Sequence, residues 1–171
     1  MLIRTRQPAD DAAVYTLVKD AFATMEHASG DEQNLVGRLR KSAGYLPELD
    51  LVAEQDGEIA GSLMLTKIQI GNAEELILAP LAVAPARQRR GIGGALILQA
   101  HRIAKNLGYG LIVLVGHPTY YPRFGYRPAS GFGLTCAPEI PAECFMAFDL
   151  TGKAEKTDAF VSFPSVFFSA D

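Results

Sequence analysis

A basic, glycine-rich segment near the middle of the chain carries the clearest chemical signal. Residues 86–95 read Ala-Arg-Gln-Arg-Arg-Gly-Ile-Gly-Gly-Ala and follow an apolar run. The first turn of a helix has backbone N–H groups without intrahelical partners and the positive end of the helix dipole. Glycines at that point let a phosphate come close to the backbone, and arginines beside them add positive charge. The segment therefore predicts a pyrophosphate site.

Three phosphate-binding patterns compete for this segment. A P-loop requires Gly-Lys followed by Ser or Thr, which the segment lacks. The dinucleotide fingerprint requires a third glycine where Leu96 stands and an acidic residue further on, but residues 110–116 contain no acid. The third pattern, Gln/Arg-x-x-Gly-x-Gly/Ala, is matched by Gln-Arg-Arg-Gly-Ile-Gly at 88–93. A glycine-rich helix start that binds no ligand is the alternative.

The residues on either side predict a strand, a helix and a second strand. The run 76–83 predicts a strand, and the apolar spacing over 95–107 predicts a helix that Gly108 ends. The continuous apolar run 111–115 predicts a strand buried on both faces. Because Pro80 cannot donate a ladder hydrogen bond, we expect a bulge or interruption that parts the two strands and admits an extended ligand. An edge strand with Pro80 facing solvent is the alternative.

The rest of the chain predicts an alternation of helices and strands. We expect one helix from Pro8 until Gly30 breaks it, a second over 32–41, and a short one over 118–124. Strands are expected over 2–6, 51–55, 59–70 and 144–150, with an Asp56-Gly57 hairpin turn.

Composition limits the class of protein. With 171 residues, 49% of them apolar and 20% charged, the chain fits one soluble globular domain. A formal net charge of −3 argues against a general nucleic-acid binder. The N-terminus lacks the apolar run of a signal peptide, and no stretch approaches the roughly 20 apolar residues of a membrane span. We therefore expect a cytoplasmic protein with no membrane partner, in which Cys136 and Cys144 are free thiols.

Three stretches together carry a resemblance to a known family. They are Pro-Leu-Ala-Val-Ala-Pro at 80–85, the 88–93 pattern, and Tyr-Tyr-Pro-Arg-Phe-Gly-Tyr at 120–126. In them the chain resembles the GNAT superfamily of acetyl-CoA-dependent N-acetyltransferases, and most of all its YhbS-type branch. The resemblance covers about residues 1–150 and implies one GNAT domain there, with residues 151–171 as a C-terminal aromatic tail packed on it. The implied fold is α/β, with a mixed central sheet of about six to seven strands, splayed between the fourth and fifth and flanked by helices.

The resemblance also implies an activity and a cofactor. The activity is transfer of acetyl from acetyl-CoA to a primary amine of a small molecule or peptide, by direct attack in a ternary complex and without a metal. The implied cofactor contacts are Leu81, Ala82 and Val83 for the pantetheine arm, and Gln88, Arg89, Arg90, Gly91, Ile92, Gly93, Gly94 and Ala95 for the pyrophosphate. A catalytically silent acyl-CoA-binding sensor is the main alternative. A nucleotide-dependent oxidoreductase is disfavoured by the failed dinucleotide pattern.

Tyr121 stands where the family has the tyrosine that protonates the leaving thiolate, four residues before Gly125. A phenol, with a pKa of about 10, suits that role, and a packed aromatic is the alternative. Candidates for the general base or acceptor site are Glu26, His27, Glu32 and His117. The alternative is a solvated surface group for the first three and a cap of the short helix for His117. We expect the aromatic tail to pack in the core, with an acceptor pocket or a homodimer interface as alternatives.

Overall fold

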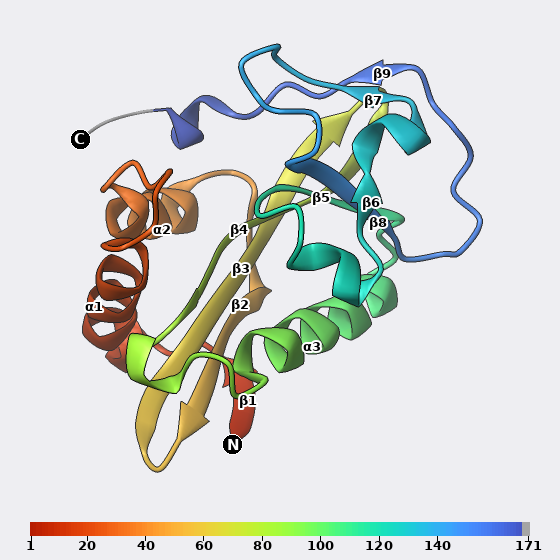
Figure 1. Ribbon diagram of the computed structural model, residues 1–171. Helices are drawn as coiled ribbons and strands as arrows, with labels where there is room; N and C mark the ends of the chain where they lie inside the picture. The colour runs from red at the N-terminus through yellow and green to blue at the C-terminus, as the bar shows by residue number, and fades with distance from the viewer. Residues whose placement is uncertain (169–171) are drawn as a thin grey trace.

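A seven-stranded mixed sheet with helices on both faces forms the frame of the protein (Figure 1). The computed structural model describes residues 1–168, so residues 169–171 of the expected tail lie outside the described part. The β4–β5 pair is parallel and the other pairs are antiparallel. The strand order is β1 (Leu2–Thr5), β2 (Tyr45–Gln55), β3 (Glu58–Ile70), β4 (Ala73–Val83), β5 (Leu111–Val115), β8 (Phe145–Asp149) and β6 (Arg127–Pro128). This is the mixed, helix-flanked sheet that the sequence predicted.

Helices cover the two faces of the sheet unequally. α1 (Asp11–Phe22) and α2 (Glu32–Lys41) pack on one face, and α3 (Ile92–Asn106) packs on the other (Figure 1). Successive side chains of β3 serve the two layers alternately, since Leu63 packs toward α3 and Met64 toward α1. Burial on both faces explains why this strand reads as a nearly continuous apolar run.

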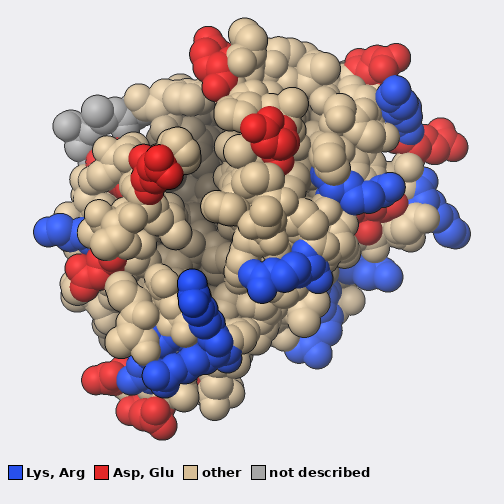
Figure 2. Space-filling view, viewed as in Figure 1, with Lys and Arg blue, Asp and Glu red and all other residues tan. Residues whose placement is uncertain are grey.

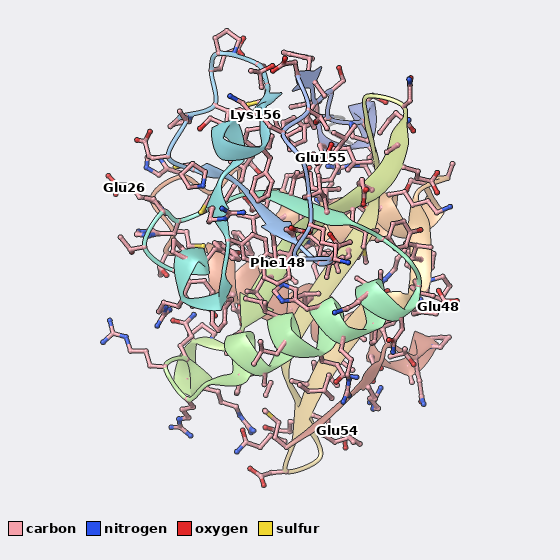
Figure 3. The ribbon with its side chains drawn as sticks, turned by 90° about the vertical axis from the view of Figure 1, so that its right-hand side faces the viewer. Glu26, Glu48, Glu54, Phe148, Glu155 and Lys156 are labelled. Atoms are coloured by element: carbon pink, nitrogen blue, oxygen red, sulfur yellow. The ribbon has the colours of Figure 1, made fainter. Side chains whose placement is uncertain are left out.

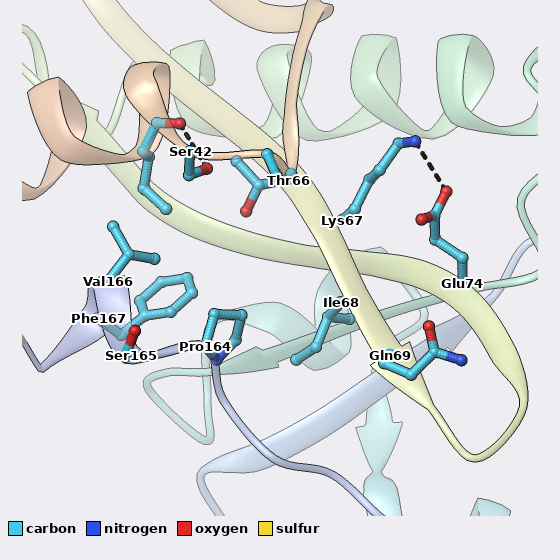
Figure 4. A pocket seen from close by; sticks show the side chains of 13 residues that line it. Ser42, Thr66, Lys67, Ile68, Gln69, Glu74, Pro164, Ser165, Val166 and Phe167 are labelled. Carbon is cyan, nitrogen blue, oxygen red and sulfur yellow. Dashed lines mark hydrogen bonds and ion pairs between the residues drawn. The ribbon is translucent and has the colours of Figure 1, made fainter.

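The C-terminal residues run across the sheet on the side of α2. A short parallel pair, β7 (Leu134–Thr135) and β9 (Ala159–Phe160), leads into them, and Val161 then bridges to Ile70 of β3. The Arg38 guanidinium on α2 donates to the Val166 carbonyl at 3.3 Å. Figure 4 shows Pro164–Phe167 facing β3 across a cavity of about 360 Å³.

Three local expectations were wrong. α1 ends at Phe22 rather than at Gly30, because the residues after it are mostly exposed and give a helix no apolar face to bury. β2 begins at Tyr45, since its pairing with β3 extends past a bulge to Tyr45↔Thr66. The expected helix over 118–124 is a single 3₁₀ turn, η3 (Tyr121–Phe124), which Gly125 ends in the left-handed conformation at φ +91°.

Candidate active site

The two central strands separate part-way along their length. β4 pairs with β5 at Leu76↔Ile112 and Ile77↔Val113, and beyond that point it pairs with β3 alone. The β3–β4 register shifts at Met64, which lies opposite both Ala79 and Pro80. This β-bulge and the splay between the fourth and fifth strands are the features that Pro80 predicted.

The splay leaves one backbone edge of β4 without a strand partner. Leu81, Ala82 and Val83 lie on this stretch and pair on their other side with β3. In an antiparallel pair, alternate residues point their N–H and C=O groups away from the partner strand. Such groups need hydrogen-bond partners when they are covered. The edge is therefore suited to an extended ligand that carries amides of its own.

A tight loop connects this edge to the start of α3. Arg89 and Gly91 both have positive φ, at +60° and +82°, and Gly91 caps the helix without a side-chain hydrogen bond. Left-handed residues in such a loop turn successive N–H groups toward one point, where an anion can bind. No atom lies within 4 Å of where a Gly91 Cβ would be, so its left-handed backbone is what favours glycine.

The four polar side chains of this loop divide into two pairs. Arg87 donates to Glu58 at 2.6 Å and to the Gln55 carbonyl at 3.1 Å, which ties the loop to the β2–β3 hairpin. Gln88 donates to the Val83 carbonyl at 3.2 Å. Arg89 and Arg90 are exposed, and within residues 1–168 neither makes an ion pair or a side-chain hydrogen bond. Their charges are therefore available to a phosphate.

Gly93 and Gly94 serve packing as well as access. A Cβ on Gly93 would collide with the Tyr120 hydroxyl, and one on Gly94 would lie 2.8 Å from the Phe124 ring. The segment from Tyr120 to Phe124 therefore rests directly on the first turn of α3. The sequence interpretation, in which all three glycines admit a phosphate, missed this second role.

Tyr121 lies at the open end of β5. Its ring packs so closely on Gly116, just after that strand, that a Cβ there would collide with it. Edge-to-face contacts with Tyr120 and Tyr126, with ring centroids 5.1 and 5.7 Å apart, fix the ring from two sides. Burial raises the pKa of the Tyr121 hydroxyl above its ordinary value of 10. The hydroxyl therefore holds its proton at neutral pH, and no group in the described chain hydrogen-bonds it.

A buried polar group behind Tyr121 was not predicted. His101 of α3 meets the Tyr126 hydroxyl at 3.0 Å and stacks on Phe148 with ring centroids 4.0 Å apart. Figure 3 labels Phe148 between α3 and the sheet. Burial lowers the pKa of His101 from 6.5 to about 4, so the ring is neutral. The burial of His101 could have been predicted from the helical spacing, which places position 101 on the apolar face of α3.

The four candidates for the base are held in different ways. Glu26 and His27 are exposed in the loop between α1 and α2, and Figure 3 shows Glu26 at the outer edge of the molecule. The Glu32 carboxylate accepts from the Ser29 N–H at 2.6 Å and from the Gly30 N–H at 3.1 Å, which fixes that loop. His117 Nδ1 lies 3.0 Å from the Thr119 hydroxyl. In the described chain, no hydrogen bond joins any of them to Tyr121.

The surface over the splay is hollowed. Figure 2 shows this hollow near the middle of the face seen in Figure 1, with Lys and Arg side chains at its lower end. Within residues 1–168 no helix is long and apolar enough to span a membrane. The same residues hold no cluster of His, Cys, Asp or Glu suited to a metal ion.

Known proteins match both the sequence and the fold. A family model described as "Acetyltransferase (GNAT) domain" matches residues 48–128. The uncharacterized N-acetyltransferase YjhQ of Escherichia coli (strain K12) is 35% identical over 130 residues, which cover 71% of this chain and 72% of that protein. The uncharacterized N-acetyltransferase YhbS of the same organism is 31% identical over 140 residues, covering 80% and 79%.

Two solved structures share the fold over nearly the whole chain. The crystal structure of YhbS from Escherichia coli in complex with CoA matches with a TM-score of 0.88 at 26% identity, covering 98% of this chain and 92% of that one. A GNAT family acetyltransferase from Brucella melitensis in complex with acetyl-CoA matches with a TM-score of 0.80 at 28% identity, covering 97% of each chain.

Proposed function

Because this chain belongs to the GNAT family of acetyl-CoA-dependent acetyltransferases, we propose that it acetylates a primary amine by direct attack in a ternary complex. Acetyl-CoA, when bound, supplies the activated acetyl thioester. The chain's own residues bind it, orient it and manage the protons.

Two features of the chain fit acetyl-CoA. Arg89 and Arg90, which are exposed and have no partner within residues 1–168, suit a pyrophosphate together with the N–H groups of the first turn of α3. The free edge of β4 at Leu81, Ala82 and Val83 suits the two amides of a pantetheine arm. An N–H near Leu81 or Ala82 is also placed to donate to a thioester carbonyl, as an oxyanion donor does.

Tyr121 is the observation that carries the proposal. Its ring packs at the open end of β5, and its hydroxyl, which has no protein partner in the described chain, keeps its proton because burial of the side chain raises its pKa. We assign it the role of general acid that gives this proton to the departing thiolate sulfur.

The acceptor amine needs a base. An alkyl ammonium with a pKa of about 10 must lose a proton before it attacks. Glu32 and His117 already hydrogen-bond their own loops. Glu26 and His27 carry no hydrogen bond in the described chain, so they are the two candidates with a free side chain.

The test compares Tyr121→Phe with Tyr120→Phe. Phe keeps the ring packing and removes only the hydroxyl, so we expect acetyl-CoA affinity to stay unchanged in calorimetry. Turnover, measured as thiol release with a panel of amines, should fall ~10²-fold or more in Tyr121→Phe. Tyr120→Phe should stay near wild type. Equal losses in the two variants would make Tyr121 a packing residue, and binding without release by the unaltered protein would indicate the silent sensor instead.

A further inference from the structure

A second cavity, of about 230 Å³, opens beside the strand splay. β4 and β5 contribute Ala79 and Val115, at the point where the two strands have parted. The loop before β8 contributes Ile140, and the C-terminal segment contributes Phe163, Phe167 and Phe168. Among residues 1–168, no charged or hydrogen-bonding side chain lines the cavity.

This cavity lies on the face of the sheet opposite α3. Ile112 and Leu114 of β5 pack in the cluster that holds α3, whereas Val113 packs on the other face with the C-terminal phenylalanines. Val115 follows Val113 by two residues and shares its face. Tyr121 packs with the α3 cluster. A ligand in the cavity therefore reaches the splay from the side opposite the acetyl-CoA site.

We propose that this cavity holds the apolar part of the acceptor, so that the substrate is a primary amine attached to an uncharged phenyl or short branched alkyl group. The inference rests on the proposed function and names the substrate class of that site. The cavity is smaller than the roughly 300–1,000 Å³ that encloses a whole drug-sized ligand, so it fits one group of a substrate. A charged group buried there would lose its hydration without gaining a partner.

The exposed surface of the cavity also calls for an apolar ligand. The Val115 and Phe168 side chains are 46% and 72% exposed. Apolar side chains gathered at a cavity mouth mark a surface that gains stability when a ligand covers it. The 360 Å³ cavity beside α2 differs in that charged side chains line it. Its one ammonium group, on Lys67, is already paired with Glu74 at 2.8 Å (Figure 4).

The walls of the cavity are fixed by the fold. Phe163 makes edge-to-face contacts with Phe145 and Phe167, with ring centroids 6.1 and 6.4 Å apart. The Phe167 N–H donates to the Pro164 carbonyl at 3.1 Å. A pocket whose aromatic rings are already in place loses little conformational entropy when the ligand binds.

The test measures amine binding directly, apart from catalysis. Phenethylamine and ethanolamine are titrated by calorimetry into protein saturated with CoA, which lacks an acetyl group to transfer. We expect phenethylamine to bind roughly tenfold tighter or more, since it buries a phenyl ring. Ile140→Glu places a carboxylate in the cavity and should weaken phenethylamine at least about tenfold with no change in CoA affinity. The matched control is Leu98→Glu, on the exposed side of α3, which should change neither.

Two results would overturn the assignment. The first is equal affinity for the two amines, or phenethylamine affinity that Ile140→Glu leaves unchanged. The second is an Ile140→Glu variant that weakens hexanoyl-CoA and spares phenethylamine, because the cavity would then hold an acyl chain. If the amines bind as expected but no thiol is released from acetyl-CoA, the proposed function is wrong, while the assignment of the cavity as an amine-binding site is retained.

Discussion

Two groups of arginines in this protein have opposite surroundings. Arg6 and Arg40 converge on the Asp50 carboxylate, with Nε–Oδ2 distances of 3.2 and 2.9 Å, and the Tyr45 hydroxyl donates to the same oxygen at 3.0 Å. Asp50 is fully buried. Arg89 and Arg90 are exposed and have no ionic partner among residues 1–168. The same type of side chain thus neutralises a buried charge on β2 and stays unpaired and exposed in the loop before α3, within the described chain.

The difference follows from where the counter-charge comes from. Asp50 lies on β2, Arg6 just after β1 and Arg40 on α2, so the ion pairs join three elements of the fold. A buried charge must find its partners inside the protein, since desolvation is otherwise too costly. Arg89 and Arg90 stay in water and need no such partner. A set of arginines without carboxylates is therefore a better sign of a ligand site than arginine content itself.

Removing Asp50 tests the structural end of this comparison and should have the largest effect. Asp50→Ala removes the buried acceptor of the Arg6 and Arg40 guanidinium groups and of the Tyr45 hydroxyl, and leaves the exposed Asp11, at 3.0 Å from each arginine, as their remaining carboxylate partner. We expect the free energy of unfolding in urea to fall by about 3–5 kcal/mol. The folded fraction should still bind acetyl-CoA with normal affinity. A loss below about 1 kcal/mol would mean that solvent satisfies these arginines.

Removing the charges of Arg89 and Arg90 tests the ligand end. The double variant Arg89→Gln/Arg90→Gln should bind acetyl-CoA roughly 30-fold more weakly, because two charge-assisted hydrogen bonds to phosphate are lost. Its stability should not change. Added salt should weaken the wild type more than the variant in calorimetry. The control is Arg102→Gln on α3, and equal weakening there would point to a general charge effect.

His101 is a third case beside the two groups of arginines, because it is a titratable group that is buried in its neutral form. Its pKa is lowered to about 4, so the unfolded chain takes up a proton below pH 6.5 while the native state does not. Stability is therefore complete above pH 6.5 and falls as the pH drops toward 4. Between pH 6.5 and about pH 5 the loss should be about 1.5 kcal/mol.

Replacing the ring should remove this dependence on pH. His101→Phe lowers overall stability, since the Tyr126 hydroxyl loses its partner, but it should flatten the slope of unfolding free energy in that window. The carboxylates with lowered pKa, such as Asp10, lose their contribution only at more acidic pH. The exposed His27→Gln should keep the slope. An unchanged slope in His101→Phe would assign the pH dependence to other groups.

The parts of the molecule that the sequence predicted are those with local signals. The helix start at Gly91, the buried strand Leu111–Val115 and the interruption at Pro80 each depend on a few adjacent residues. The parting of β4 from β5 followed from Pro80, because proline cannot support a two-sided ladder.

The parts that the sequence did not predict depend on distant partners. Nothing near Asp50 along the chain shows that Arg6 will face it, since 44 positions separate the two residues. Gly93 and Gly94 were attributed to phosphate access alone, because only the structure places Tyr120 and Phe124 upon them. The sequence could not predict the cavity proposed for the acceptor for the same reason, because its walls come from β4, β5 and residues 140–168.

The bulge at Ala79 and Pro80 also determines which face of the sheet each later side chain of β4 occupies. Leu78 and Leu81 stand three residues apart, which in a regular strand would put them on opposite faces, yet both pack toward α3. Ala82 in turn packs toward α1 and α2. The additional residue thus shifts the alternation of β4 by one position. Residues before and after the bulge that face α3 are therefore separated by an odd number of positions. Deleting a single residue here would exchange the two faces of the strand from Leu81 to Val83, so that Leu81 would turn toward α1 and α2 and Ala82 toward α3.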